Sequence, residues 1–153
     1  MRVNGFEPFI VDGKLLVLGS FPSVKSRETG FYYGNRQNRF WRVLAETFSL
    51  PAPVTIEEKK DLLRRCGVSL WDVVVECDIV GSMDKDIKDP VLADLPALLA
   101  AHPYERILAN GATAYALLTQ AYPALSPLAV KMPSTSPANG RFDPTVWHRE
   151  LRR

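Results

Sequence analysis

The sequence predicts an α/β fold, with a central, mainly parallel, twisted sheet covered by helices on both faces. Short apolar runs typical of buried strands alternate along the chain with segments of helical periodicity. The intervals between successive strands are long enough for the crossover helices that parallel strands require. The 153 residues, of which 46% are hydrophobic and 24% charged, fit one globular unit, so we expect a single domain over residues 1–153.

The first predicted elements lie before residue 50. A hairpin turn is expected at Asp12-Gly13, because this dipeptide separates two short apolar runs. Residues 15–18 are expected to form a buried strand that ends at Gly19. Residues 38–48 place large apolar side chains at helical spacing with charged ones opposite, which predicts an amphipathic helix whose apolar stripe packs in the core.

The middle of the chain begins with a helix whose two ends are marked. Thr55 and Glu58 form a capping-box pattern, and Gly67 is typical of a helix C-terminus, so the helix should lie between them. The apolar run at residues 68–75 predicts one further strand. Residues 77–88 are polar and acidic, which indicates a surface loop.

The second half continues the alternation of helices and strands. Asp94 and Asp143 can each cap a helix, since a proline that follows closely fits in the first helical turn. Between these two helices we expect a strand at residues 106–110, a helix at 112–122 and a strand at 128–132.

Several functional classes are excluded by composition. No apolar run approaches the roughly 18 residues needed to span a bilayer, and the N-terminus lacks the pattern of a signal peptide. We therefore expect a cytoplasmic protein with no membrane partner. The two cysteines, Cys66 and Cys77, are too few for a disulfide framework, an all-cysteine zinc site or a thiolate-bound iron–sulfur cluster, and we expect neither metal nor cofactor.

The net charge of +2 conceals an uneven distribution. Residues 1–53 carry 7 basic and 4 acidic side chains, residues 54–105 carry 6 and 11, and residues 106–153 carry 6 and 2. A polyanion would therefore meet the two ends of the chain. The alternative is that the asymmetry only solvates two faces of the molecule.

Ligands of such folds bind beyond the carboxyl ends of the strands, which selects residues 19–23, 110–111 and 133–139. The segment GSFPSVKSRETGFYYGNRQNRFW, residues 19–41, is too long and aromatic for a simple connector. It contains donors for phosphate, basic side chains and rings that can stack on a base. These are Gly19, Ser20, Ser23, Ser26, Lys25, Arg27, Arg36, Arg39, Phe31, Tyr32 and Tyr33. The segment suits a nucleotide-binding wall or, alternatively, a surface loop held down by its three aromatic side chains.

The segment PSTSPANG, which follows the last predicted strand, repeats this chemistry. Pro133 and Pro137 stiffen the chain, so its hydroxyls can be held in a fixed shape against a DNA strand. The candidate DNA contacts here are Ser134, Thr135, Ser136 and Asn139. A stiff turn without a function is the alternative.

The motifs LVLGSFPS, FYYGNRQNRFW, LANG and MPSTSPAN, in this order, resemble the hypoxanthine-DNA glycosylase branch of the uracil-DNA glycosylase superfamily. The resemblance covers about residues 9–151. It implies a central parallel sheet flanked by helices, and excision of a deaminated base from DNA after the nucleotide is flipped out of the stack. The substrate would be DNA that contains deoxyinosine, with deoxyuridine as a second candidate. The resemblance demands no metal.

The resemblance also implies how water is placed for attack on the sugar. Many branches of the superfamily carry an Asp or Asn at the third position of the first motif, where this chain has Phe21. The resembling branch uses an Asn of the second motif instead, which points to Asn38, with Asn35 as the competitor. An amide oxygen can orient water but has no useful basicity, so electrostatics would supply most of the catalysis. A helix cap is the alternative role of Asn38.

Asn110, at the end of its strand, is the candidate reader of the base. Hypoxanthine and uracil share a carbonyl next to an N–H, which one fixed amide can match, whereas adenine and cytosine present the reverse pattern. A turn residue before Gly111 is the alternative. The other candidates for base contact are Phe21, Tyr33, Gly19 and Ser20, and those for DNA contact outside the last loop are Ser23, Lys25, Arg36 and Arg39.

Two other functions remain open from the sequence. One is a mismatch-specific uracil-DNA glycosylase of the same fold, and the other is a noncatalytic nucleic-acid-binding domain, suggested by the missing acid at Phe21. Lys25 or Lys131 could form a Schiff base with the abasic sugar. The resemblance does not ask for this step, so we expect a monofunctional glycosylase that acts as a monomer.

Overall fold

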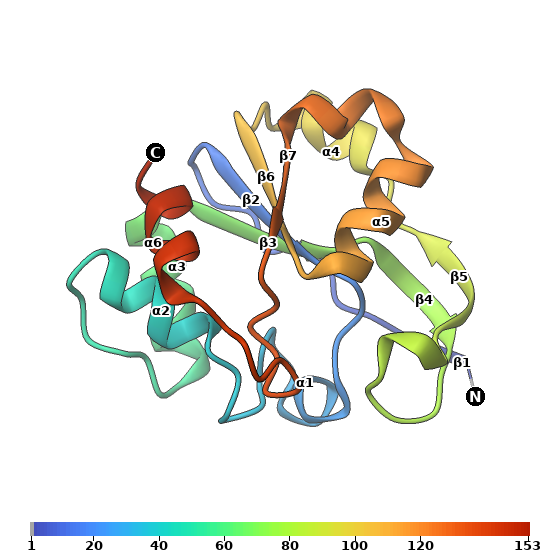
Figure 1. The fold of residues 1–153 in the computed structure, drawn as a ribbon, viewed down its shortest axis with the longest axis horizontal. Coiled ribbons are helices and arrows are strands. Elements are labelled where there is room, and N and C mark those ends of the chain that lie inside the picture. Colours follow the sequence, from blue (N-terminus) through green and yellow to red (C-terminus); the bar gives the residue numbers. More distant parts are fainter. Residues whose placement is uncertain (1) are drawn as a thin grey trace.

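The computed structural model describes residues 2–153. Its centre is a four-stranded sheet in the order β3-β2-β6-β7, in which every pairing is parallel (Figure 1). The four strands are β2 (Leu15–Gly19), β3 (Val68–Asp72), β6 (Arg106–Asn110) and β7 (Ala129–Met132). The predicted α/β fold with a parallel central sheet is confirmed.

Helices cover both faces of this sheet because its strands carry apolar side chains on both. Leu15 and Val17 of β2 pack in the cluster formed with three helices, α2 (Phe40–Thr47), α3 (Ile56–Cys66) and α6 (Pro144–Arg152). Leu16 and Leu18 face the cluster on the other side, which includes residues of α4 (Leu95–Ala101) and α5 (Ala112–Ala121). Figure 1 shows these two groups of helices on opposite sides of the strands. Successive residues of a strand point to opposite faces, so a continuous apolar run supplies both cores.

The predicted capping residues lie at the helix termini where they were expected. Thr55 and Glu58 form the reciprocal capping box of α3, and Gly67 closes that helix in the left-handed conformation, with φ 70°. Asp94 accepts a hydrogen bond from the Ala97 N–H at the start of α4, and Asp143 caps α6 in the same manner. Local sequence therefore fixes these helix boundaries.

The predicted hairpin at Asp12-Gly13 is wrong. Phe9 instead forms an isolated antiparallel bridge with Leu70 of β3. The buried hydroxyl of Ser69 accepts a hydrogen bond from the Val11 N–H at 2.9 Å. Contacts with β3, which lies far along the chain, thus replace the local strand pairing that the turn dipeptide predicted.

The single strand predicted at residues 68–75 is two strands that belong to different sheets. The chain leaves the parallel sheet at Val73, and β4 (Val74–Asp78) lies between β1 (Arg2–Asn4) and β5 (Lys88–Leu92) in an antiparallel sheet. The predicted surface loop therefore begins after Asp78 and contains the short helix η1 (Asp84–Asp86). Sequence could not reveal β5, because this exposed edge strand has no apolar alternation and contains a proline.

The long segment between β2 and α2 contains a helix that was not predicted, α1 (Val24–Thr29). The Ser23 side chain accepts a hydrogen bond from the Ser26 N–H, and Gly30 ends the helix in the left-handed conformation. Only Ser26 of this helix is buried, so it has no apolar stripe that periodicity could detect. A second short helix, η2 (Pro123–Leu128), leads into β7.

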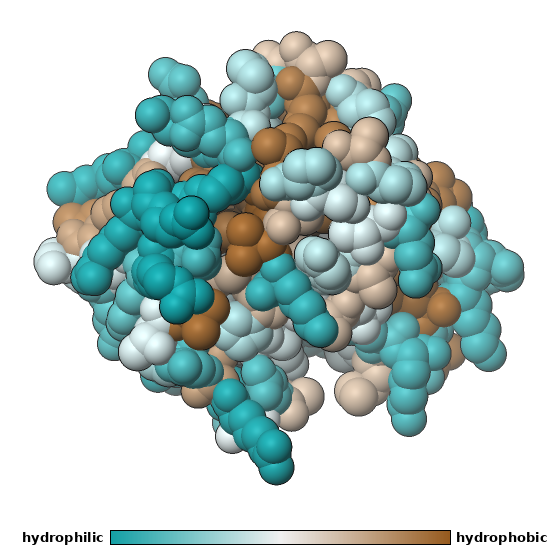
Figure 2. Space-filling view, turned by 45° about the horizontal axis from the view of Figure 1, so that its top comes forward, coloured by the Kyte–Doolittle hydropathy of each residue, from teal (hydrophilic) through white to brown (hydrophobic). Residues whose placement is uncertain are grey.

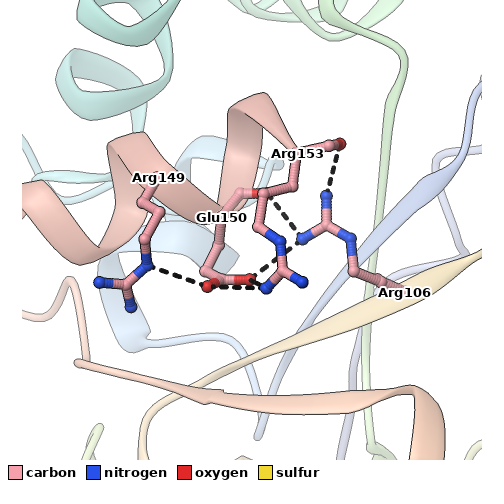
Figure 3. A network of polar contacts seen from close by, with 4 residues as sticks. All are labelled: Arg106, Arg149, Glu150 and Arg153. Carbon is pink, nitrogen blue, oxygen red and sulfur yellow. Dashed lines mark hydrogen bonds and ion pairs between the residues drawn. The ribbon is translucent and has the colours of Figure 1, made fainter.

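A buried carboxylate joins α6 to the sheet. Glu150, 4% exposed, forms ion pairs with Arg106 of β6 at 3.2 Å, with Arg149 at 3.2 Å and with Arg153 at 3.1 Å (Figure 3). The Arg106 guanidinium also donates to the Glu150 carbonyl at 2.7 Å. These contacts compensate the cost of burying the carboxylate and fix the C-terminal helix against the start of β6.

The outer surface is mainly polar. Figure 2 shows hydrophilic side chains over most of the face in view, with hydrophobic side chains in smaller areas between them. Within residues 2–153, no helix has the length and apolar character needed to cross a bilayer. The same residues bring together no group of three or more His, Cys, Asp and Glu side chains that could hold a metal ion.

Candidate active site

A cavity of about 910 Å³ lies at the carboxyl edge of the parallel sheet, a volume that accommodates a small organic ligand. Its walls come from the segment after β2, the end of β3, the η1 region, the end of β6 and the loop at residues 133–139. In Figure 1 the chain that follows β7 runs down to α1. The three segments selected by the strand-end rule therefore meet at one site, as predicted.

Three strand ends form a row along one wall of this cavity. The register pairs Gly19 of β2 with Asp72 of β3, and the β2–β6 register places Asn110 next to Gly19 on the other side. A side chain at Gly19 would collide with Asp72 Oδ1, and its Cβ would lie 3.3 Å from the Tyr33 hydroxyl. The glycine thus leaves the space in which the Asp72 carboxyl and the Tyr33 hydroxyl lie.

The Asn110 side chain is held in a fixed orientation by Thr135. Asn110 Nδ2 donates to Thr135 Oγ1 at 2.9 Å, and Asn110 Oδ1 accepts from the Thr135 N–H at 2.9 Å. One N–H and one lone pair of the amide remain for a ligand. Thr135 was expected to contact DNA, but it is fully buried, so it positions Asn110 instead.

The loop at residues 133–139 is a rigid turn that also lines the cavity. Asn139 Nδ2 donates to the Ser134 carbonyl at 3.0 Å, and the Ser136 N–H donates to Ser134 Oγ at 3.2 Å. Arg39 donates to the carbonyls of Ser136 at 3.1 Å and Asn139 at 2.9 Å. The Arg39 guanidinium, a predicted DNA contact, is therefore used to hold this loop. Ser134, Ser136 and Asn139 remain half-buried at the cavity wall.

Both candidate asparagines for placing water line the cavity. Asn38 Oδ1 accepts from the Phe40 N–H at 2.9 Å, which satisfies a donor at the start of α2. Asn35 Oδ1 accepts from the Gln37 N–H at 2.9 Å in a similar local turn. The N-cap of α2 is Arg39, so Asn38 is not the cap itself, but its amide oxygen satisfies the first N–H of the helix and keeps a second lone pair for water.

The three consecutive aromatic residues of this segment have different environments. Phe31 is in the core, stacked on Trp41 at 5.9 Å, and it lines no part of the cavity. Tyr32 reaches the cavity wall, but its hydroxyl donates to the Glu7 carbonyl at 2.6 Å. Tyr33 lines the cavity with a left-handed backbone, φ 53°, a conformation that costs about 1 kcal/mol. Of the three rings that were candidates for stacking on a base, only Tyr32 and Tyr33 reach the cavity and remain candidates.

The Tyr33 hydroxyl is buried and has no hydrogen-bond partner within residues 2–153. Burial raises the pKa of Tyr33, the charge of Asp72 raises it further, and the Asn110 side chain acts in the opposite direction. The phenol is therefore neutral and can donate or accept one hydrogen bond in the cavity.

Phe21, 9% exposed, lines the same cavity under the Arg27 guanidinium, which lies 5.7 Å from the ring centre.

The candidate phosphate contacts surround the cavity unevenly. Ser20, Ser23 and Lys25 line it, and the Lys25 ammonium lies 3.6 Å from the Glu28 carboxylate. Ser20 Oγ donates to Asp84 Oδ1 at 2.5 Å, so its hydroxyl hydrogen is already used. Arg36 is exposed and lies outside the cavity wall.

The sequence profile of the uracil DNA glycosylase superfamily matches residues 9–151. This chain belongs to that superfamily. It is 32% identical over 149 residues to a Methanosarcina acetivorans protein named hypoxanthine DNA glycosylase, across 93% of this chain and 91% of that protein. A Methanosarcina barkeri protein of the same name is 31% identical over 114 residues, or 72% of each chain.

A solved structure has the same superfamily fold. It is the solution NMR structure of a candidate uracil DNA glycosylase from Methanosarcina acetivorans, with a TM-score of 0.82, 30% identity and coverage of 100% of both chains. These relatives confirm the resemblance to the hypoxanthine-DNA glycosylase branch and the fold that it implied.

One residue of this superfamily member was missed by sequence reasoning. Asp72, at the end of β3, is 4% exposed, lines the cavity, and has no hydrogen-bond partner for Oδ2 within residues 2–153. Burial raises the pKa of Asp72 to about 7, and the charge of Asp84 contributes to the rise. The available signal was a carboxylate within the predicted strand at residues 68–75, a strand whose carboxyl end lies at the edge where ligands bind.

Proposed function

We propose that this superfamily member is a DNA glycosylase that excises hypoxanthine from deoxyinosine, and uracil as a second substrate, leaving an abasic site. The observation that carries the proposal is the Asn110 amide, held by two hydrogen bonds to Thr135 at the wall of a cavity of about 910 Å³. The names of the two Methanosarcina relatives support hypoxanthine as the base.

Specificity would follow from the donors and acceptors that Asn110 keeps. Hypoxanthine and uracil each present a carbonyl next to an N–H, and the amide offers one N–H and one lone pair to match them. Adenine and cytosine present an amino donor next to an acceptor, so they would leave buried polar groups unpaired. The base would enter after the nucleotide is flipped out of the duplex.

Bond cleavage would depend on placed groups and electrostatics. The departing base carries negative charge and the sugar becomes oxocarbenium-like, so a water molecule must be oriented next to the sugar. Asn38 is our choice for this role, because the first turn of α2 fixes its side chain at the cavity wall. No step uses a lysine, and one copy of the chain holds every proposed group, so the enzyme would be monofunctional and act as a monomer.

The direct test is single-turnover formation of abasic sites on a duplex that contains one deoxyinosine, with a deoxyuridine duplex in parallel. We expect abasic product from the wild-type protein. Asn38→Ala should slow excision about 100-fold or more with nearly unchanged DNA affinity, because the lost contact belongs to the transition state. Asn35→Ala is the matched control, since Asn35 makes a similar local hydrogen bond at the same cavity.

Other results of this assay would identify one of the alternative functions or the alternative asparagine. DNA binding without abasic product would identify a noncatalytic nucleic-acid-binding domain. Uracil excision far faster than hypoxanthine excision would identify a mismatch-specific uracil-DNA glycosylase. A wild-type rate in Asn38→Ala together with a slow Asn35→Ala would transfer the water-placing role to Asn35.

A further inference from the structure

Asp72 is a buried carboxyl group that the function proposed above does not use. It lies beside Gly19 at the end of β3, lines the cavity, and its Oδ2 atom has no partner within the described residues 2–153. Asn110 ends β6 on the opposite side of β2. Neighbouring strands are about 4.8 Å apart and β2 separates β6 from β3, so two strand spacings leave room for a base bound against Asn110 to extend over Gly19 toward Asp72.

Resting on the proposed function, we propose that Asp72 is a further catalytic residue, the general acid that gives a proton to the departing base. No group of residues 2–153 forms a hydrogen bond with Oδ2. Gly19 has no side chain, and this leaves the Asp72 carboxyl the space that it occupies. A neutral carboxyl group in an apolar site is an effective donor, because burial disfavours its charged form.

The step balances in atoms and electrons. The bond between C1′ and the base nitrogen breaks, and both electrons stay on the base. The Asp72 Oδ2–H bond breaks and its proton passes to the base, which leaves as a neutral molecule. Water forms the new bond to C1′, and the proton that it releases returns to the Asp72 carboxylate through solvent. The products are the free base and the abasic sugar.

The groups around Asp72 favour its neutral form. Burial and the charge of Asp84 in the η1 region raise the pKa of Asp72. The phenols of Tyr32 and Tyr33 lie near enough for the Asp72 charge to raise their own pKa values, so both stay neutral. The remaining charged residues of the cavity wall are Lys25, Glu28 and Lys85. The pKa of about 7 places the change of charge within the working range of an enzyme.

The test is the pH dependence of single-turnover hypoxanthine excision for wild-type protein, Asp72→Asn and Asp84→Asn. We expect the wild-type rate to fall about tenfold for each pH unit above the pKa of Asp72. Asp72→Asn keeps the shape of the side chain but not its acidity, so its rate should be at least 100-fold lower at pH 6 and should lose the alkaline fall. Asp84→Asn removes a charge that raises this pKa, so its alkaline fall should begin at lower pH.

A carboxyl ¹³C NMR titration of Asp72 provides a readout that is independent of activity. A carboxyl that titrates below pH 5, an excision rate that rises through the pKa, or an Asp72→Asn rate within threefold of wild type at pH 6 would each overturn the assignment of the acid. In the last case wild-type excision would still establish the proposed function. Absence of abasic product from wild-type protein at every pH would overturn the proposed function itself.

Discussion

Asp72 shows how one residue can couple the stability of this protein to its chemistry. Its carboxyl is buried at the end of β3, next to the glycine that leaves room for it. A solvated aspartate would titrate near 3.8, whereas this one has a pKa of about 7. The protein therefore carries, at its cavity, an acid that remains largely protonated where other carboxylates are ionised.

This shift predicts a measurable dependence of stability on pH. Between about pH 4 and pH 7 the folded state binds the Asp72 proton and the unfolded state does not, so the contribution of this group to stability falls as pH rises through that window. A rise of the pKa from 3.8 to about 7 corresponds to about 4 kcal/mol of stability over the whole window. Urea unfolding at pH 4.5 and pH 8 should show most of this loss, about 3 kcal/mol, in wild type relative to Asp72→Asn, which lacks the titration. Equal pH dependence in the two proteins would contradict the buried acid.

At the scale of elements, the loop at residues 133–139 connects the end of β6 with the start of α2 through hydrogen bonds. Its Thr135 holds Asn110 of β6, and its backbone accepts hydrogen bonds from Arg39, directly before α2. The Arg39 N–H also donates to the Thr135 carbonyl at 3.0 Å. The orientation of the Asn110 amide, the proposed reader of the base, therefore depends on a contact between segments almost 100 residues apart in sequence.

Arg39→Ala should loosen this loop without unfolding the protein. Two carbonyls lose a charged donor, and such hydrogen bonds contribute about 1.5 to 3 kcal/mol. We expect faster amide hydrogen exchange in residues 134–139 and excision slowed at least tenfold, because Asn110 loses its fixed orientation. Arg42→Ala, on the exposed side of α2, is the control. Unchanged exchange in the loop would show that Arg39 does not hold it.

At the scale of the whole molecule, the two basic ends of the chain meet at one cavity. The segments that line it come mainly from residues 19–38 and 133–139, which belong to the basic parts of the sequence, and only a few lining residues come from the acidic middle. Exposed Arg36 lies within the first of these segments, and exposed Arg141 follows the second by two residues. We expect these two exposed guanidinium groups, rather than the cavity wall itself, to attract a polyanion to this side of the molecule.

Binding to DNA should therefore weaken with added salt. Contacts with a few phosphates predict a slope of roughly −3 to −5 in a plot of log affinity against log salt concentration. Arg36→Gln should reduce the magnitude of this slope by about one. Arg65→Gln on α3, outside the cavity wall, should leave it unchanged. Fluorescence anisotropy with a labelled duplex measures both, and a slope near zero would exclude phosphate contacts.

The sequence by itself determined those features whose physical cause is local. Continuous apolar runs specified β2 and β6, the spacing of Phe40, Trp41 and Leu44 specified α2, and the capping box and Gly67 specified α3. The strand-end rule also placed the site, because the carboxyl ends of parallel strands lie at one edge of the sheet.

Only the tertiary structure decided the features whose cause lies far away in the chain. Asp72 is an acid with a pKa of about 7 because it is buried in the folded chain and Asp84 of another segment adds its charge, and no pattern near residue 72 contains that information. Thr135 and Arg39 hold groups of the site instead of facing DNA because their partners lie on other elements. Local sequence reports propensity and patterning, whereas burial and the pairing of polar groups exist only after distant segments have come together.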